Sequence, residues 1–256
     1  MNDPRPAVLV TGGARRIGAA IARRFGEAGW HVVIHYGSSQ AEAQRLADEL
    51  PSAECVQCDL ADGDAAVAMV EALAARLPDW RALVNCAAIF EPDAVTELDP
   101  ATNLRSMQIN ARTPARMAQA YLARARAPAG RRVIQFTDQK LANPNPDFFS
   151  YTMSKHALAS TVPMLAMGAA RPDDRVYALA PGAILASHDQ REEETEISHR
   201  MNLLKRKTGQ DEVAKAALFL AQGHLASGQT LYCDSGQHLL SQPRDVIYLA
   251  REERHA

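Results

Sequence analysis

The sequence lacks the long apolar stretches of membrane proteins, and aromatic residues make up only 5% of it. None of its apolar runs approaches the roughly 18 residues that a membrane-spanning helix needs. The 28 basic and 30 acidic residues leave a net charge of −2, which argues against nucleic acid or an anionic membrane as the main partner. No signal peptide is evident before the first apolar run. These absences predict a soluble, cytoplasmic protein.

Cysteine is also scarce, and the four cysteines form no obvious metal or redox site. Cys55 and Cys58 have the Cys-x-x-Cys spacing, but a zinc site needs a second ligand pair, and Cys86 and Cys233 are isolated. A redox pair usually stands at a helix N-terminus, whereas residues 53–57 have the pattern of a short strand. The sequence therefore predicts structural thiols and no bound metal.

Short apolar runs alternate with longer amphipathic stretches along the whole chain of 256 residues. The expected strands are 7–10, 31–35, 54–57, 82–84, 132–136, 175–178 and 230–233. The expected helices are 17–28, 40–50, 64–77, 103–126, 151–170 and 211–222. Such alternation is typical of right-handed βαβ units. We therefore expect α/β architecture, with residues 1–256 forming a single doubly wound Rossmann domain around a seven-stranded parallel sheet.

Three segments interrupt the alternating pattern. Residues 141–150 are rich in Asn and Pro, residues 187–207 are highly charged, and residues 241–256 form a long tail. Loops beyond about 12 residues in compact domains are often lids or binding segments. We expect 187–207 to be a substrate lid, with a solvated helical insert as the alternative. The tail either reaches a neighbouring subunit's site or forms a disordered surface.

A glycine-rich turn follows the first expected strand, with the sequence Thr-Gly-Gly-Ala-Arg-Arg-Ile-Gly at residues 11–18. Small residues at this place let the backbone approach a pyrophosphate, whose charge is favoured by the N-terminus of the next helix. The candidate nucleotide-binding residues of the turn are Gly12, Arg15, Arg16, Ile17 and Gly18.

The end of the second expected strand bears on the choice of cofactor. In nucleotide-binding folds a carboxylate at this place holds the adenosine ribose 2′-OH and repels a 2′-phosphate. Here no acidic residue follows the strand before Glu42. Arg15 and Arg16 can meet an extra phosphate, assisted by the hydroxyls of Ser38 and Ser39. The residues therefore favour NADPH over NADH, with ordinary surface charge as the alternative role of the arginines.

Tyr151 and Lys155 stand four residues apart in the run Tyr-Thr-Met-Ser-Lys, so their side chains share one face of a helix. A lysine ammonium a few Å from a phenol favours the phenolate, and would lower the tyrosine pKa from about 10 towards neutrality. We therefore expect Tyr151 to be the acid/base of a hydride-transfer reaction, tuned by Lys155.

Taken in order, these and other motifs resemble the short-chain dehydrogenase/reductase family over nearly the whole chain. The matching motifs are Thr-Gly-x-x-x-x-x-Gly at 11–18, Asp-Leu at 59–60, Asn-Cys-Ala-Ala at 85–88, Asn110, Tyr-x-x-x-Lys at 151–155, Pro-Gly at 181–182 and Asp-Ser-Gly at 234–236. Each motif alone is weak, whereas the set in this order and spacing is specific.

The resemblance implies a role for each matching residue. Cofactor contacts would come from Asp59 and Leu60 at the adenine, Asn85 and Ala87 along the cofactor, and Pro181 and Gly182 at the nicotinamide. Lys155 would also hold the nicotinamide ribose, and Asn110 would support a proton-relay water beside it. Because members of the family are usually tetramers, a homotetramer is expected.

One catalytic position departs from the family. Its serine normally precedes the tyrosine by 13 residues, and here that position holds Asp138. Ketone reduction builds an alkoxide, and a like charge about 4 Å away costs about 4 kcal/mol at an effective dielectric near 20. A ring C=N differs because its nitrogen gains a proton as hydride reaches the carbon. Asp138 therefore favours a basic nitrogen heterocycle as the substrate.

Within the family, one branch resembles this combination, namely the pteridine reductases and the bacterial dihydromonapterin reductases. They combine Asp, Tyr and Lys with an arginine in the phosphate turn and an aromatic residue after the fourth strand, where this chain has Arg16 and Phe90. The resemblance implies that Phe90 stacks a pterin ring, that Arg16 contacts both cofactor and pterin, and that Asp138 and Tyr151 complete the substrate site. A packing role is the alternative for Phe90.

The expected function is therefore NADPH-dependent reduction of a dihydropterin. Candidate substrates are 7,8-dihydromonapterin and 7,8-dihydrobiopterin, with weaker activity on dihydrofolate. One alternative is a general short-chain carbonyl or 3-oxoacyl reductase that tolerates Asp138. Another is an NADPH-binding sensor without turnover, although the intact Asn110, Tyr151 and Lys155 argue against it.

Overall fold

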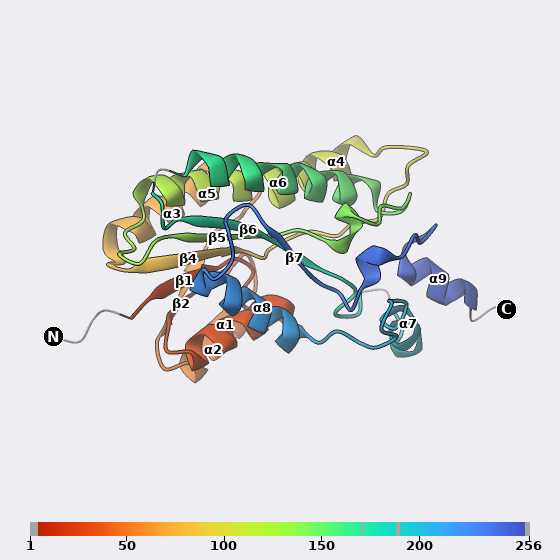
Figure 1. Ribbon diagram of the computed structural model, residues 1–256, viewed down its shortest axis with the longest axis horizontal. Helices are drawn as coiled ribbons and strands as arrows, with labels where there is room; N and C mark the ends of the chain where they lie inside the picture. Colours follow the sequence, from red (N-terminus) through yellow and green to blue (C-terminus); the bar gives the residue numbers. More distant parts are fainter. Residues whose placement is uncertain (1–4, 170, 188–189, 254–256) are drawn as a thin grey trace.

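A parallel sheet forms the centre of the molecule in the computed structural model, which describes residues 5–169, 171–187 and 190–253 (Figure 1). Its strands are β1 (Ala7–Val10), β2 (His31–Tyr36), β3 (Ala53–Gln57), β4 (Trp80–Asn85), β5 (Arg132–Phe136), β6 (Arg175–Pro181) and β7 (Thr230–Cys233). They lie in the order β3-β2-β1-β4-β5-β6-β7, and every pairing is parallel. The prediction of a doubly wound, seven-stranded Rossmann domain is confirmed.

Helices cover both faces of this sheet (Figure 1). One face carries α1 (Arg16–Glu27), α2 (Gln40–Glu49) and α8 (Gln210–Gln222). The other carries α3 (Gly63–Arg76), α4 (Pro100–Met107), α5 (Thr113–Arg124) and α6 (Phe149–Gly168). Within the described ranges, no helix is both long and apolar enough to cross a membrane.

The expected long helix at 103–126 is divided into three parts. A π-helical turn, η1 (Gln108–Arg112), separates α4 from α5. Pro114, in the first turn of α5, lacks the N–H that would donate to the carbonyl of Asn110, so the regular hydrogen-bond ladder cannot continue through this point. The other expected elements differ mainly at their ends, and the predicted helix end at residue 170 lies outside the described residues.

Two of the segments predicted as loops contain short helices. Helix α7 (Glu192–Ser198) lies within 187–207, and α9 (Val246–Glu253) lies within the tail. The acidic start of α7 is favourable because carboxylates stabilise a helix N-terminus. The two helices contact each other beyond the end of the sheet (Figure 1). A disordered tail is therefore wrong for residues 241–253, while residues 254–256 lie outside the description.

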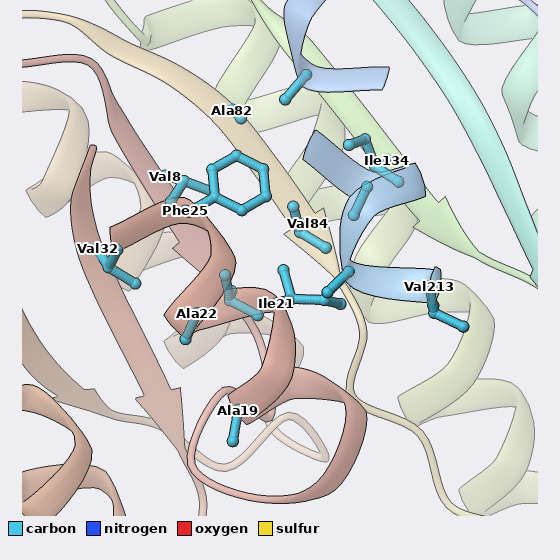
Figure 2. Close-up of a cluster of buried hydrophobic side chains, with 14 of the residues drawn as sticks. Val8, Ala19, Ile21, Ala22, Phe25, Val32, Ala82, Val84, Ile134 and Val213 are labelled. Atoms are coloured by element: carbon cyan, nitrogen blue, oxygen red, sulfur yellow. The ribbon is translucent and has the colours of Figure 1, made fainter. Parts of the chain in front are cut away.

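Separate apolar cores hold the helices to the two faces of the sheet. Figure 2 shows the core under α1, where Ile21 and Phe25 pack against Val8 of β1 and Val84 of β4. On the opposite face, Trp80 and Tyr121 pack edge to face with ring centroids 4.8 Å apart. With both faces covered, the loops after the strand ends are the part of the sheet left open for a ligand.

Candidate active site

A cavity of about 630 Å³ lies at the carboxyl ends of the strands, around the switch point between β1 and β4. Open α/β sheets bind their ligands at such switch points. All predicted site residues line it except Asn85 and Asn110. Those that do are Gly12, Arg15, Arg16, Ile17, Gly18, Ser38, Ser39, Asp59, Leu60, Ala87, Phe90, Asp138, Tyr151, Lys155, Pro181 and Gly182.

The glycine-rich turn is shaped by close backbone contacts. Gly12 has a left-handed φ of 63°, and a Cβ placed on Gly18 would lie 2.2 Å from the carbonyl oxygen of Gly12. The N–H of Gly12 donates to Nδ1 of His35 at 3.1 Å, and Nε2 of His35 lies 3.0 Å from the carbonyl oxygen of Cys58. Burial lowers the pKa of His35 to about 4, so it is a neutral imidazole with its proton on Nε2. Its role was missed because it depends on three elements that meet only in the fold.

The two arginines of the turn point to different partners. Arg16 has a φ of 55°, in the left-handed region that favours glycine. Its guanidinium donates to the carbonyl oxygen of Ala186 at 2.7 Å, next to the segment predicted as a lid. Arg15 is exposed and lies 3.9 Å from Glu42. Both arginines line the cavity, as do Ser38 and Ser39.

A cluster at the end of β5 contains the half-buried Asp138 and the buried Tyr151 and Lys155. The phenol of Tyr151 donates to Oδ2 of Asp138 at 2.7 Å. The backbone N–H of Lys140 donates to Oδ1 of Asp138 at 2.9 Å. The ammonium of Lys155 donates to the carbonyl oxygen of Phe136 at 2.7 Å and lies 5.5 Å from the centroid of the Tyr151 ring.

This geometry corrects the expectation that Lys155 lowers the pKa of Tyr151. Burial, and then the Asp138 carboxylate, raise the pKa of Tyr151 well above its ordinary value. Burial also lowers the pKa of Lys155 to about 8 and raises the pKa of Asp138, which its hydrogen-bond donors only partly oppose. Sequence spacing cannot reveal desolvation, which is the largest cause of all three shifts. The phenol is therefore protonated and the carboxylate is its acceptor.

Phe90 belongs to a small aromatic cluster next to Tyr151. Its ring stacks on Phe148, with centroids 3.9 Å apart, and meets the Tyr151 ring edge to face at 4.7 Å. The ring of Tyr248 also stacks on Phe148, with centroids 6.0 Å apart. Phe148 and Tyr248 were missed because the sequence gives no sign that the tail returns to this loop. Stacking of a pterin on Phe90 stays a prediction.

The two predicted residues that do not line the cavity support its walls. The amide of Asn85 donates to Oε1 of Gln135 at 2.9 Å and to the carbonyl oxygen of Pro114 at 3.1 Å, so its side chain does not reach a ligand in the cavity. Asn110 exchanges two hydrogen bonds of 2.9 Å with the backbone of Ile89, directly before Phe90. Asn110 thus fixes the loop after β4, and its relay-water role stays a prediction.

The comparisons with known proteins agree with this architecture. A family model described as enoyl-(acyl carrier protein) reductase matches residues 12–238. The chain therefore belongs to the short-chain dehydrogenase/reductase family of oxidoreductases, and that prediction is confirmed.

Similar proteins narrow the comparison within the family. Dihydromonapterin reductase of Citrobacter koseri is 29% identical over 93% of this chain and 98% of that protein. The FolM alternative dihydrofolate reductase 1 of Brucella canis, solved with NADP, is 34% identical with a TM-score of 0.86, covering 94% of this chain and 96% of that one. The angucycline C-6 ketoreductase LanV, also with NADP, is 27% identical with a TM-score of 0.83, covering 92% and 96%.

Proposed function

We propose that the protein is an NADPH-dependent reductase that converts 7,8-dihydromonapterin or 7,8-dihydrobiopterin to the tetrahydro form, with weaker activity on dihydrofolate. The hydrogen bond between the Tyr151 phenol and the Asp138 carboxylate at the cavity wall carries the proposal, because a ketone reductase would place a hydrogen-bond donor there. The similarity to dihydromonapterin reductases and to a FolM dihydrofolate reductase supports it.

The turn after β1 fits a dinucleotide cofactor. A Cβ on Gly12 would come within 3.2 Å of Ala87, so only glycine lets the turn pack this closely against the loop after β4 at the cavity. The residues described at the end of β2 that line the cavity include no carboxylate, whereas Arg15 and Arg16 border it. These residues favour NADPH over NADH because they can bind the extra 2′-phosphate. When bound, NADPH would supply the hydride for the ring carbon C6.

The residues of the catalytic cluster handle the proton that ring nitrogen N5 must gain. As the Tyr151 phenol gives its proton to the Asp138 carboxylate, Asp138 would pass a proton through a water to N5. The resulting phenolate, next to the Lys155 ammonium, would regain its proton from solvent. Burial raises the pKa of Asp138, which makes the carboxyl a better proton carrier near neutral pH than an ordinary aspartate. Lys155 adds positive charge beside this pair and would hold the nicotinamide ribose.

A general carbonyl or 3-oxoacyl reductase is the second candidate. The similarity to the LanV ketoreductase favours it, since that protein shares the fold at a TM-score of 0.83. Asp138 opposes it, because a carboxylate bonded to the catalytic phenol would repel an alkoxide. Turnover of ketones or quinones with NADPH at rates above those of dihydropterins would favour this candidate.

We also propose that four copies assemble in the cytoplasm. Apolar side chains are exposed along α4 and α6, including Leu104 at 71%, Met153 at 41%, Met164 at 57% and Met167 at 81%. An exposed apolar patch of this kind is typical of a protein interface.

Replacement of Asp138 tests the proposed chemistry. In Asp138→Ser we expect dihydropterin turnover to fall by about 100-fold or more, the range of a lost general acid, while NADPH affinity changes by less than about threefold. The exposed Asp173 lies in a loop outside the cavity lining, and Asp173→Ser is the matched control. Equal dihydropterin turnover in Asp138→Ser would count against the mechanism.

A further inference from the structure

Lys140 is a buried lysine two residues after Asp138, and its charge is neutralised by the C-terminal part of the chain. It lies in the 3-10 turn Gln139–Leu141 and is 3% exposed. Its ammonium is 2.8 Å from Oδ2 of Asp245 and donates to Oδ1 of Asn145 at 2.7 Å. Since lysines are almost never fully buried without a partner, Asp245 is what permits this lysine to lie beside the catalytic carboxylate.

Asp245 is itself held in place at the start of α9. Its backbone N–H donates to Oδ2 of Asp147 at 2.8 Å, and its Oδ1 accepts from the N–H of Ile247 at 3.0 Å. Asp245, Val246 and Ile247 all line the cavity. The C-terminal segment 241–253 is thus a wall of the active site in its own subunit.

The same segment forms hydrogen bonds with the loop 141–150, which lies between Asp138 and Tyr151 in the sequence. Asn143 donates to Oε1 of Gln242 at 3.1 Å, and the N–H of Gln242 donates back to Oδ1 of Asn143 at 3.0 Å. Arg244 donates to Oδ2 of Asp147 at 2.8 Å. The loop is rich in Asn and Pro and takes much of its fixed shape from these contacts.

Lys140 acts on Asp138 in two ways. Its backbone N–H fixes one carboxylate oxygen, while the phenol of Tyr151 occupies the other. The backbone hydrogen bond from Lys140 and the positive charge of its ammonium both lower the pKa of Asp138, whereas burial raises it. Lys155 of α6 also lowers the pKa of Asp138, while the Asp245 carboxylate raises the pKa of Tyr151.

We propose that Lys140 is a positioning residue for Asp138 and that Asp245 acts through Lys140, so that the C-terminal segment completes the proton-handling site of its own subunit. The inference rests on the proposed function in one respect, the role of Asp138 as the proton carrier. The contacts from Asp245 to Lys140 and from Lys140 to Asp138 form its physical basis.

Steady-state kinetics of Asp245→Asn with 7,8-dihydromonapterin is the first part of the test. The amide keeps an oxygen for the N–H of Ile247 but removes the charge that neutralises Lys140. We expect kcat to fall about tenfold or more with the Kd for NADPH unchanged within about twofold, because positioning acts on the transition state. Glu252→Gln makes the same carboxylate-to-amide change at an exposed site of α9 and should retain kcat.

A double variant separates positioning from simple stabilisation. Lys140→Met with Asp245→Asn removes both charges, so no buried charge is left without a partner. If the pair only holds the fold, the double variant regains wild-type kcat, and the proposal is wrong. If Asp245 acts through Lys140, adding Asp245→Asn to Lys140→Met changes kcat by less than about twofold, whereas independent, multiplying losses would overturn the proposal.

A readout without substrate distinguishes the inference from the proposed function. Carbon-13 NMR of labelled aspartate, with Asp138 assigned through Asp138→Asn, follows the titration of this carboxyl in the cofactor-free protein. We expect Lys140→Met to move its midpoint upward by about half a pH unit or more, because an opposing positive charge is lost. An unchanged midpoint contradicts the inference. A shifted midpoint in a protein that turns over no dihydropterin leaves the inference standing and rejects the proposed function alone.

Discussion

Three clustered side chains at the end of β5 are central to the proposed chemistry. Asp138 accepts the phenol hydrogen of Tyr151, and Lys155 donates to a backbone carbonyl rather than to the phenol. Burial raises the pKa of Asp138 and of Tyr151 and lowers the pKa of Lys155, so it favours the neutral form of each group. The hydrogen bond between the Tyr151 and Asp138 oxygen atoms therefore contains a proton that can be transferred, which suits the proposed protonation of a ring nitrogen.

A substitution of Arg16 tests the preference for NADPH over NADH. Its φ of 55° is strained for a side chain but not for glycine, so Arg16→Gly removes the guanidinium without damaging the turn. We expect the ratio of kcat/KM for NADPH to that for NADH to fall about tenfold or more, the scale of a lost charged hydrogen bond. Thermal unfolding of the same variant should occur at or above the wild-type Tm. An unchanged ratio would mean that Arg16 does not contact the 2′-phosphate.

Sequence reasoning located most of the cavity because its residues stand directly after strands, where parallel strands place their ligands. It missed Lys140, Phe148 and His35, whose roles arise from contacts with other elements. The sign of the Tyr151 pKa shift was also beyond it. Spacing on a helix shows that two side chains are neighbours, whereas burial depends on everything packed around them.

Hydrogen bonds of one histidine connect the ends of the neighbouring strands β1, β2 and β3. His35 of β2 accepts the N–H of Gly12 after β1 and donates to the carbonyl of Cys58 after β3. It connects the phosphate turn to two neighbouring strands only while its ring is neutral. Burial, which lowers its pKa from 6.5 to about 4, disfavours the charged ring in the folded state.

This histidine makes stability depend on pH with a defined sign. Between pH 6.5 and about pH 4 the unfolded chain binds a proton on His35 that the folded protein does not, so stability falls as the pH falls through this window. The full effect is roughly 3 kcal/mol. Chemical denaturation at several pH values should show the wild type losing its stability advantage over His35→Gln across the window. A constant difference between the two proteins would contradict this assignment.

Long, regular elements were predictable, because alternation of apolar runs with amphipathic stretches is strong over β1 to α3 and again from β5 to α6. The break at η1 was not, since Pro114 is tolerated in the first turn of a helix and gives no sign of where the preceding helix stops. Helices α7 and α9 are short and carry many charges, so their patterns resemble those of solvated loops. Packing against each other stabilises them.

At the scale of the whole molecule, the chain closes one end of the cavity with its own C-terminal segment. The N-terminal strand β1 lies inside the sheet between β2 and β4, while α9 lies beyond the sheet next to α7 (Figure 1). Ile247 of α9 joins Phe148 and Tyr151 in one apolar cluster. This part of the cavity is therefore built from segments that are about 100 residues apart in the sequence, and each must fold before the proposed site is complete.

Assembly into a tetramer is expected to depend on the apolar face of α4 and α6. Leu104 and Met153 are exposed there, so Leu104→Glu combined with Met153→Glu should yield a smaller species, because burying like charges in an interface is costly. Size-exclusion chromatography with light scattering measures the mass. Arg45→Glu on the exposed side of α2 is the control and should remain a tetramer. A monomeric wild type would contradict the proposed assembly.

The most direct measurement is NADPH oxidation by the purified protein with 7,8-dihydromonapterin, 7,8-dihydrobiopterin and dihydrofolate in parallel, beside a panel of ketones and quinones. We expect turnover of the two dihydropterins, slower turnover of dihydrofolate, and little with the carbonyl compounds, because the Asp138 carboxylate accepts the hydrogen bond of the Tyr151 phenol. Tight NADPH binding with no oxidation by any of the three pterins would contradict it, as would carbonyl turnover faster than that of the dihydropterins.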